Sequence, residues 1–148
     1  MIQNFVNEIE YLLSQIPTEQ WADPDKCGLC YEFVPWHGMS AVTVQVRDDD
    51  PRDAGDWKYY FSAESDGSRV RAEVEEYRAS GDRLVHHRLL IEAAEALLSV
   101  DLTRYVPNLV ATDGVCLYKP FKVQVYDADA TFGFNYCEYV LARRLESA

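Results

Sequence analysis

Two cysteines separated by two residues are the first side chains in this sequence that could do chemistry. Cys27 and Cys30 have the C-x-x-C spacing of half a structural zinc site, and a complete site needs four ligands. Cys116 and Cys137 stand alone in the sequence, and His37 is a candidate third ligand. A redox site needs the pair at the start of a helix after a strand, which the flanking residues do not provide. We therefore expect no metal ion and no cofactor, and keep as the alternative a small metal- or thiol-dependent enzyme built on Cys27 and Cys30.

The histidines and glycines form no catalytic motif. His86 and His87 are adjacent on a predicted helix, where neighbouring side chains point about 100° apart and cannot converge on one metal ion. The sequence has no G-x-S-x-G nucleophile motif, and it has neither of the phosphate-binding patterns G-x-x-x-x-G-K-[ST] and G-x-G-x-x-G. We therefore expect a protein that is not an enzyme and has no catalytic residues.

Carboxylates are concentrated in one short segment. Five aspartates lie within residues 48–56, with a spacing that does not fit a calcium-binding loop. Trp57 follows them, and an aromatic anchor beside a charged rim is typical of protein interfaces. A second pair, Asp127 and Asp129, fits either a hydrolase or metal site or a loop whose aspartates bind backbone N–H groups, and we favour the loop. The expected partner-binding residues are Asp48, Asp49, Asp50, Asp53, Asp56, Trp57, Asp127 and Asp129.

The overall charge restricts the class of partner. The chain has 14 Lys and Arg and 25 Asp and Glu, which gives a formal net charge of −11. A surface this acidic repels nucleic acid and anionic membranes and attracts basic proteins, although the same acidity also serves solubility. We expect a basic protein as the partner, and neither nucleic acid nor a membrane. The alternative is that 48–56 is only a solvated loop, and the oligomeric state is left open.

Length and the N-terminal sequence predict the organisation and the compartment. A chain of 148 residues is expected to form one domain, 1–148. Its first residues, MIQNFVNE, lack the basic and apolar regions of a secretory signal. No apolar run approaches the ~20 residues of a membrane span. We therefore expect a cytoplasmic protein.

Periodic apolar side chains predict two helices. Residues 2–16 carry an apolar stripe at three- and four-residue steps, and Pro17 ends it. Residues 83–100 are rich in helix formers and place their leucines on one face.

Alternating side chains predict the strands. The alternation is clear at residues 42–46, 57–61 and 121–125, and residues 29–34 are predicted as a strand because they are rich in aromatic and β-forming side chains. Residues 69–76, which follow an Asp-Gly turn, and residues 135–143 fit either a strand or a helix, and we favour a strand for both. The sum predicts an α+β fold with a single antiparallel β-sheet of about five to six strands. An N-terminal helix and a long central helix are expected to pack on that sheet.

The order of these segments resembles the YezG-like immunity proteins of bacterial polymorphic toxin systems. The resemblance rests on four segments: an opening helix that runs into IPTEQW at 16–21, the strand LCYEFV at 29–34, FKVQVYDAD at 121–129 and the aromatic segment YCEYVL at 136–141. It spans most of the chain. The residue before Trp21 and the acidic loop at 48–56 depart from the family pattern.

The resemblance implies a role rather than a reaction. Members of this family bind and neutralise a cognate toxin, often a nuclease, and they have no catalytic residues to transfer. A nuclease surface is basic where it holds phosphate, so the net charge of this chain agrees with such a partner. A non-catalytic adaptor protein without a toxin is a further alternative.

Overall fold

The computed structural model describes residues 2–51, 53–111, 118–119, 121–129 and 133–147. Helices in these ranges are α1 (Gln3–Gln15), α2 (Thr18–Trp21), α3 (Arg71–Ser80), α4 (Arg83–Ser99) and α5 (Tyr136–Ser147). Strands are β1 (Lys26–Val34), β2 (Met39–Val46), β3 (Tyr59–Ser65), β4 (Val110–Ala111), β5 (Tyr118–Lys119) and β6 (Lys122–Val125). Short 3-10 turns are η1 (Pro35–His37), η2 (Ala54–Asp56), η3 (Ser68–Val70) and η4 (Leu102–Arg104).

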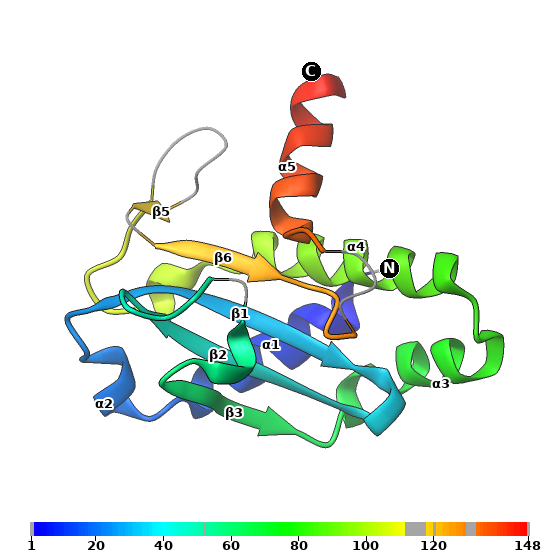
Figure 1. Ribbon diagram of the computed structural model, residues 1–148, viewed down its shortest axis with the longest axis horizontal. Helices are drawn as coiled ribbons and strands as arrows, with labels where there is room; N and C mark the ends of the chain where they lie inside the picture. Colours follow the sequence, from blue (N-terminus) through cyan, green and yellow to red (C-terminus); the bar gives the residue numbers. More distant parts are fainter. Residues whose placement is uncertain (1, 52, 112–117, 120, 130–132, 148) are drawn as a thin grey trace.

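The main sheet has four strands in the order β3-β2-β1-β6 (Figure 1). β1 pairs with β2, and β2 with β3, in antiparallel fashion, whereas β6 runs parallel to β1 and pairs Val123 with Leu29. The short strands β4 and β5 form a separate ribbon. The α+β class expected from the sequence is confirmed. The expectation of one antiparallel sheet of five to six strands is wrong, because the chain crosses over through α3 and α4 before it returns beside β1.

Two segments for which we favoured strands are helices. Residues 71–80 form α3, where Val70 and Val74 turn one helical face into the core. The turn before α3 does not make a hairpin: Gly67 has φ +70°, and a Cβ there would lie 2.6 Å from the carbonyl oxygen of Gly38. Residues 136–147 form α5, which begins where the Asn135 side chain accepts a hydrogen bond from the backbone N–H of Cys137.

The helices cover one face of the sheet. Alternate residues of β1, Leu29, Tyr31 and Phe33, point into a core that α1 and α4 share, and each of the three is fully buried. The ring of Phe5 from α1 meets the ring of Phe33 edge-on, with 5.2 Å between centroids. Figure 1 shows α1 and α4 behind the sheet and α5 projecting away from it. No helix in the described ranges has the length and apolarity needed to cross a membrane.

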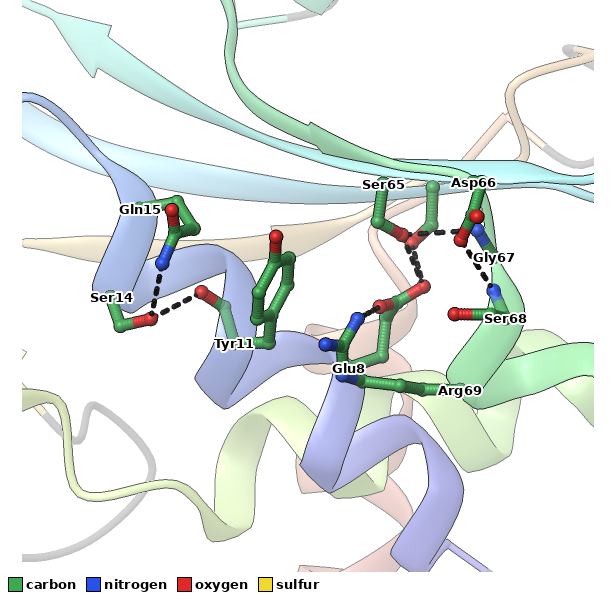
Figure 2. A network of polar contacts seen from close by, with 10 residues as sticks. Glu8, Tyr11, Ser14, Gln15, Ser65, Asp66, Gly67, Ser68 and Arg69 are labelled. Carbon is green, nitrogen blue, oxygen red and sulfur yellow. Dashed lines mark hydrogen bonds and ion pairs between the residues drawn. The ribbon is translucent and has the colours of Figure 1, made fainter.

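A buried carboxylate joins α1 to the sheet. The side chain of Glu8 is fully enclosed, and its Oε2 accepts hydrogen bonds from the hydroxyls of Ser40 (2.8 Å) and Ser65 (2.6 Å). Its Oε1 lies 3.6 Å from Nη1 of Arg69, whose guanidinium covers the ring of Tyr11 (Figure 2). These contacts tie α1 to β2, β3 and η3. A buried charge is tolerated only with such partners.

Removing this carboxylate should destabilise the fold. We expect Glu8→Ala to lower the free energy of unfolding by roughly 3 kcal/mol, because two hydroxyls and a guanidinium lose their common acceptor. Urea unfolding at neutral pH measures the change. Glu75→Ala is the matched control, since it deletes an exposed carboxylate on α3 and should leave the midpoint unchanged. Equal effects of the two substitutions would show that the Glu8 contacts do not stabilise the fold.

Candidate functional site

The acidic loop lies on the face of the sheet opposite the helices. Ala54 and Trp57 pack on Cys30 of β1, and Tyr126 adjoins them. The indole N–H of Trp57 donates to the backbone carbonyl of Asp50 at 2.6 Å, and only 3% of the residue is exposed. We expected Trp57 to contact a partner and residues 57–61 to form a strand. Instead β3 begins at Tyr59, and Trp57 holds the loop against the sheet from below.

The aspartates of the loop fall into two groups. Asp49 closes the loop, because its two carboxylate oxygens accept from the backbone N–H groups of Val46 (2.8 Å) and Lys58 (3.0 Å). Four others, Asp48, Asp50, Asp53 and Asp56, are exposed. The structure therefore brings four of the five expected loop aspartates to the surface and uses the fifth to shape the turn.

Asp53 and Asp56 form a carboxyl pair. A hydrogen bond between their side chains and the negative charge of Asp56 raise the pKa of Asp53. Such a pair is stabilised either by a shared proton or by a cation that separates the two charges. Neither residue has an ion pair within the described part of the chain. The pair is thus a place where a positive group from outside would be favoured.

The lysine that follows the loop is already neutralised. Lys58 Nζ lies 3.3 Å from Oδ2 of Asp23, and the hydroxyl of Tyr59 donates to the same oxygen at 2.6 Å. The hydrogen bond from Tyr59 is the largest of the interactions that lower the pKa of Asp23 to about 2. The positive charge of Lys58 is consequently directed toward Asp23, away from the exposed aspartates.

Asp127 and Asp129 do not form a pair of exposed carboxylates. The Asp127 side chain is fully buried, lies 3.1 Å from Nε2 of His86, and accepts from the backbone N–H of Asp129 at 2.9 Å. This is the loop arrangement that the sequence favoured. Asp129 is exposed, so of the two only Asp129 is placed for contact with a partner.

A pocket of about 450 Å³ opens between the acidic loop, the end of β1 and the start of β3. Three carboxylates line it, from Glu32, Asp53 and Asp127, and the described lining includes no lysine and no arginine. Its walls are aromatic: Trp36, His37, Tyr60, Phe61 and Tyr126. The pocket combines negative charge with ring faces, which is the composition that favours a cation.

Glu32 is the carboxylate on the floor of this pocket. It stands half-buried on β1, and it makes no hydrogen bond or ion pair within the described ranges. Burial is the main cause that raises its pKa, and the charge of Asp53 adds to the effect. Burial is also the main cause that raises the pKa of Tyr60, and the charges of Glu32 and Glu64 add to it. In both cases neighbouring carboxylates shift the pKa in the same direction as burial does.

A bulge in β3 builds the aromatic wall. The pairing of β2 with β3 shifts register between Val42 and Val44, where the Val44 N–H donates to the Ser62 hydroxyl instead of to a strand carbonyl. Phe61 has φ +48°, a left-handed conformation that is unfavourable for an aromatic residue. The ring of Tyr60 stacks on that of Phe61 with 3.9 Å between centroids, and Tyr60 remains 50% exposed at the pocket mouth.

Sequence reasoning named Asp53 and Asp127 of this pocket but missed Glu32, Tyr60 and Phe61. Glu32 was hidden inside an aromatic strand, although alternation with Tyr31 and Phe33 already places it on the opposite face. Tyr60 and Phe61 were assigned to a regular strand, and no sequence signal marks the bulge that reorients them. The signal that was available for Glu32 is a single carboxylate among apolar strand residues.

The cysteine alternative gains no support from the geometry. Cys30 is buried beneath Ala54 and Trp57, and Cys27 is half-buried. Burial raises the pKa of both thiols, which disfavours the thiolate that metal binding and nucleophilic chemistry need. In the described ranges, no three His, Cys, Asp or Glu side chains are grouped to hold a metal ion. Cys116 lies outside those ranges.

The histidines have separate surroundings. His86 lies between Asp127, Trp36 and Tyr77. The Nδ1 atom of His87 lies 2.8 Å from the hydroxyl of Tyr136. The two rings therefore point to different partners, as expected for neighbours on a helix.

Comparison of the chain with protein-family models, with curated proteins and with solved structures gives no match in any of the three. The resemblance to YezG-like immunity proteins therefore stays a prediction, and the functional argument depends on the geometry.

The pairing of Asp53 with Asp56 can be tested by measuring the pKa of Asp53. We expect the pKa of Asp53 to lie above that of an ordinary aspartate in a carbon-detected NMR titration, and to fall toward it in Asp56→Asn. A raised pKa means that the pair stabilises the folded protein below the pKa of an ordinary aspartate. This stabilisation is lost as the pH rises through the pKa of Asp53. Asp48→Asn is the control and should leave the titration of Asp53 unchanged. An ordinary or lowered pKa for Asp53 would contradict the pairing.

Proposed function

We propose that this protein is a non-catalytic binding protein of the bacterial cytoplasm that holds a basic protein against the outer face of its sheet. The observation that carries the proposal is that the loop with the exposed aspartates contributes Asp53 to a pocket lined by carboxylates and aromatic rings. The net charge of −11 gives the same sign of field at long range.

Charge and aromatic surface have different tasks in such a complex. Exposed carboxylates at a rim mainly speed association and select the sign of the partner's charge, because water screens each pair. Aromatic side chains in a pocket supply the desolvated contact that slows dissociation. Tyr60, which is half exposed beside the pocket, takes the anchoring role that the sequence suggested for Trp57.

The partner that this surface suits best is a toxin with a basic active surface. A nuclease holds phosphate with lysines and arginines, so an acidic protein that covers those groups also blocks the substrate. This is the role implied by the resemblance to immunity proteins. We therefore propose that the protein neutralises a cognate toxin encoded beside it.

Reversing the charge of the rim tests this function. We expect the triple variant Asp48→Lys, Asp53→Lys, Asp56→Lys to associate at least about tenfold more slowly with the toxin domain of the neighbouring gene at low salt. The salt dependence of the association rate should also become weaker. Surface plasmon resonance between 25 and 300 mM salt, roughly the range where screening becomes strong, measures both quantities.

A control of equal charge separates the rim from the net charge. Glu19→Lys, Glu75→Lys and Glu146→Lys make the same change on exposed positions of α2, α3 and α5. This variant should keep most of the association rate and protect cells that express the toxin. Equal slowing by both variants would contradict a binding face at the acidic loop, and a partner with no toxic activity would favour the adaptor role.

A further inference from the structure

We propose that the pocket beside the acidic loop receives one arginine side chain of the basic partner, with its guanidinium paired to Glu32 and its plane against the Tyr60–Phe61 wall. The inference rests on the proposed function and names the chemical group that this surface recognises. In Figure 1, α1 and α4 lie behind the sheet, and the face of the sheet that they leave uncovered is turned toward the viewer.

The cavity has a size suited to a side chain and an opening toward solvent. Its volume of about 450 Å³ lies within the range of roughly 300–1,000 Å³ that ligand pockets have. Four separate stretches of the sequence contribute to it: residues 32–39, 53–55, 60–61 and 126–128. Because elements far apart in the sequence converge there, the pocket is part of the fold and not a depression in one loop.

The three carboxylates of the pocket are not equivalent. Asp127 is already engaged, with His86 on one side and the backbone N–H of Asp129 on the other. Asp53 stands at the mouth, beside Asp56. Glu32 alone combines partial burial with the lack of any hydrogen bond or ion pair in the described ranges. A carboxylate in this position is unfavourable without a cation, so an incoming positive group gains a strong contact there.

The walls distinguish among cations. A calcium or magnesium ion needs six or more oxygen ligands, whereas most of this lining consists of rings and aliphatic groups. A lysine ammonium is a compact and strongly hydrated charge. An arginine guanidinium is flat and more weakly hydrated, binds a carboxylate with two parallel hydrogen bonds, and stacks on aromatic faces. The Tyr60 and Phe61 rings, stacked at 23° to each other, offer such a face.

The backbone of β3 is held in the conformation that makes this wall. Phe61 has its left-handed φ beside the bulge, where the Ser62 hydroxyl accepts from the Val44 N–H in place of a strand carbonyl. Strain of this kind persists only where the surrounding structure imposes it. The wall is therefore formed before any partner arrives, and binding does not require it to rearrange.

A titration with N-acetyl-arginine amide tests the inference on the free protein. We expect its addition to shift the NMR signals of Glu32, Trp36, Tyr60 and Phe61, with saturation in the millimolar range. N-acetyl-citrulline amide has nearly the same shape without the charge and should bind at least about tenfold more weakly, because it cannot form the ion pair. N-acetyl-lysine amide should also bind more weakly than the arginine compound. Equal binding of arginine and citrulline compounds, or shifts elsewhere on the surface, would overturn the proposal.

Substitution of Glu32 tests whether this carboxylate pairs with the guanidinium. Glu32→Gln should weaken binding of N-acetyl-arginine amide about tenfold or more, since it keeps the shape and removes the charge. It should also raise the melting temperature of the free protein, because a half-buried carboxylate without a cation is removed. Glu75→Gln is the control: it removes an exposed carboxylate from α3, outside the pocket lining, and should leave the titration unchanged. Similar effects of the two substitutions would overturn the role of Glu32.

The experiment separates this inference from the proposed function. If the rim variant slows association with the toxin but Glu32→Gln leaves its dissociation rate unchanged, the function stands and the arginine pocket is wrong. If the arginine compound fills the pocket in a Glu32-dependent way but the rim variant binds the toxin normally, the pocket stands and the proposed function fails.

Discussion

The enclosed carboxylate of Glu8 is the constraint on which the arrangement of this protein depends. A charge without access to water requires donors on several sides, and here they come from β2, β3 and η3. Because each donor belongs to a different element, these contacts fix α1 against β2, β3 and η3. The apolar side chains of α1, α4, β1 and β2 share a single core.

The outer face is consequently left to loops and polar side chains. A buried row of hydrogen bonds runs across it, in which the Tyr126 hydroxyl donates to Gln124 and the Gln124 amide donates to Gln45. This row fixes Tyr126 at one end, where its ring lines the pocket. Trp57 likewise fixes the acidic loop in place by packing on Cys30. The surface around the pocket is thus supported by buried groups, while Asp53 and Tyr60 remain exposed there.

Local patterns in the sequence predict the parts of this fold that depend on local interactions. The apolar stripe and the helix formers predict the two long helices, α1 and α4. The aromatic and β-forming residues of 29–34 predict β1, and alternation predicts β2. Residues 69–76 satisfy both periods, and the deciding fact, burial of Val70 and Val74 in the core, is tertiary. The parallel pairing of β6 with β1 follows a long crossover, which no local pattern in either strand specifies. The pocket needs four separate stretches at once, so no single stretch of sequence signals it.

The carboxylates show why composition alone misleads about function. Counting acidic residues treats Asp49 and Asp127 like any others, although both are occupied by hydrogen bonds that shape loops. Glu8 is likewise occupied in holding α1. Three other carboxylates differ from these because they have no cation among the described residues. Glu32 lines the pocket and is partly desolvated, and Asp53 lies close to the carboxylate of Asp56. Each of them raises the free energy of the isolated protein, and a bound cation lowers it. If the proposed function holds, a basic partner relieves this unfavourable energy, and part of the binding free energy then comes from carboxylates that the free protein leaves without a cation.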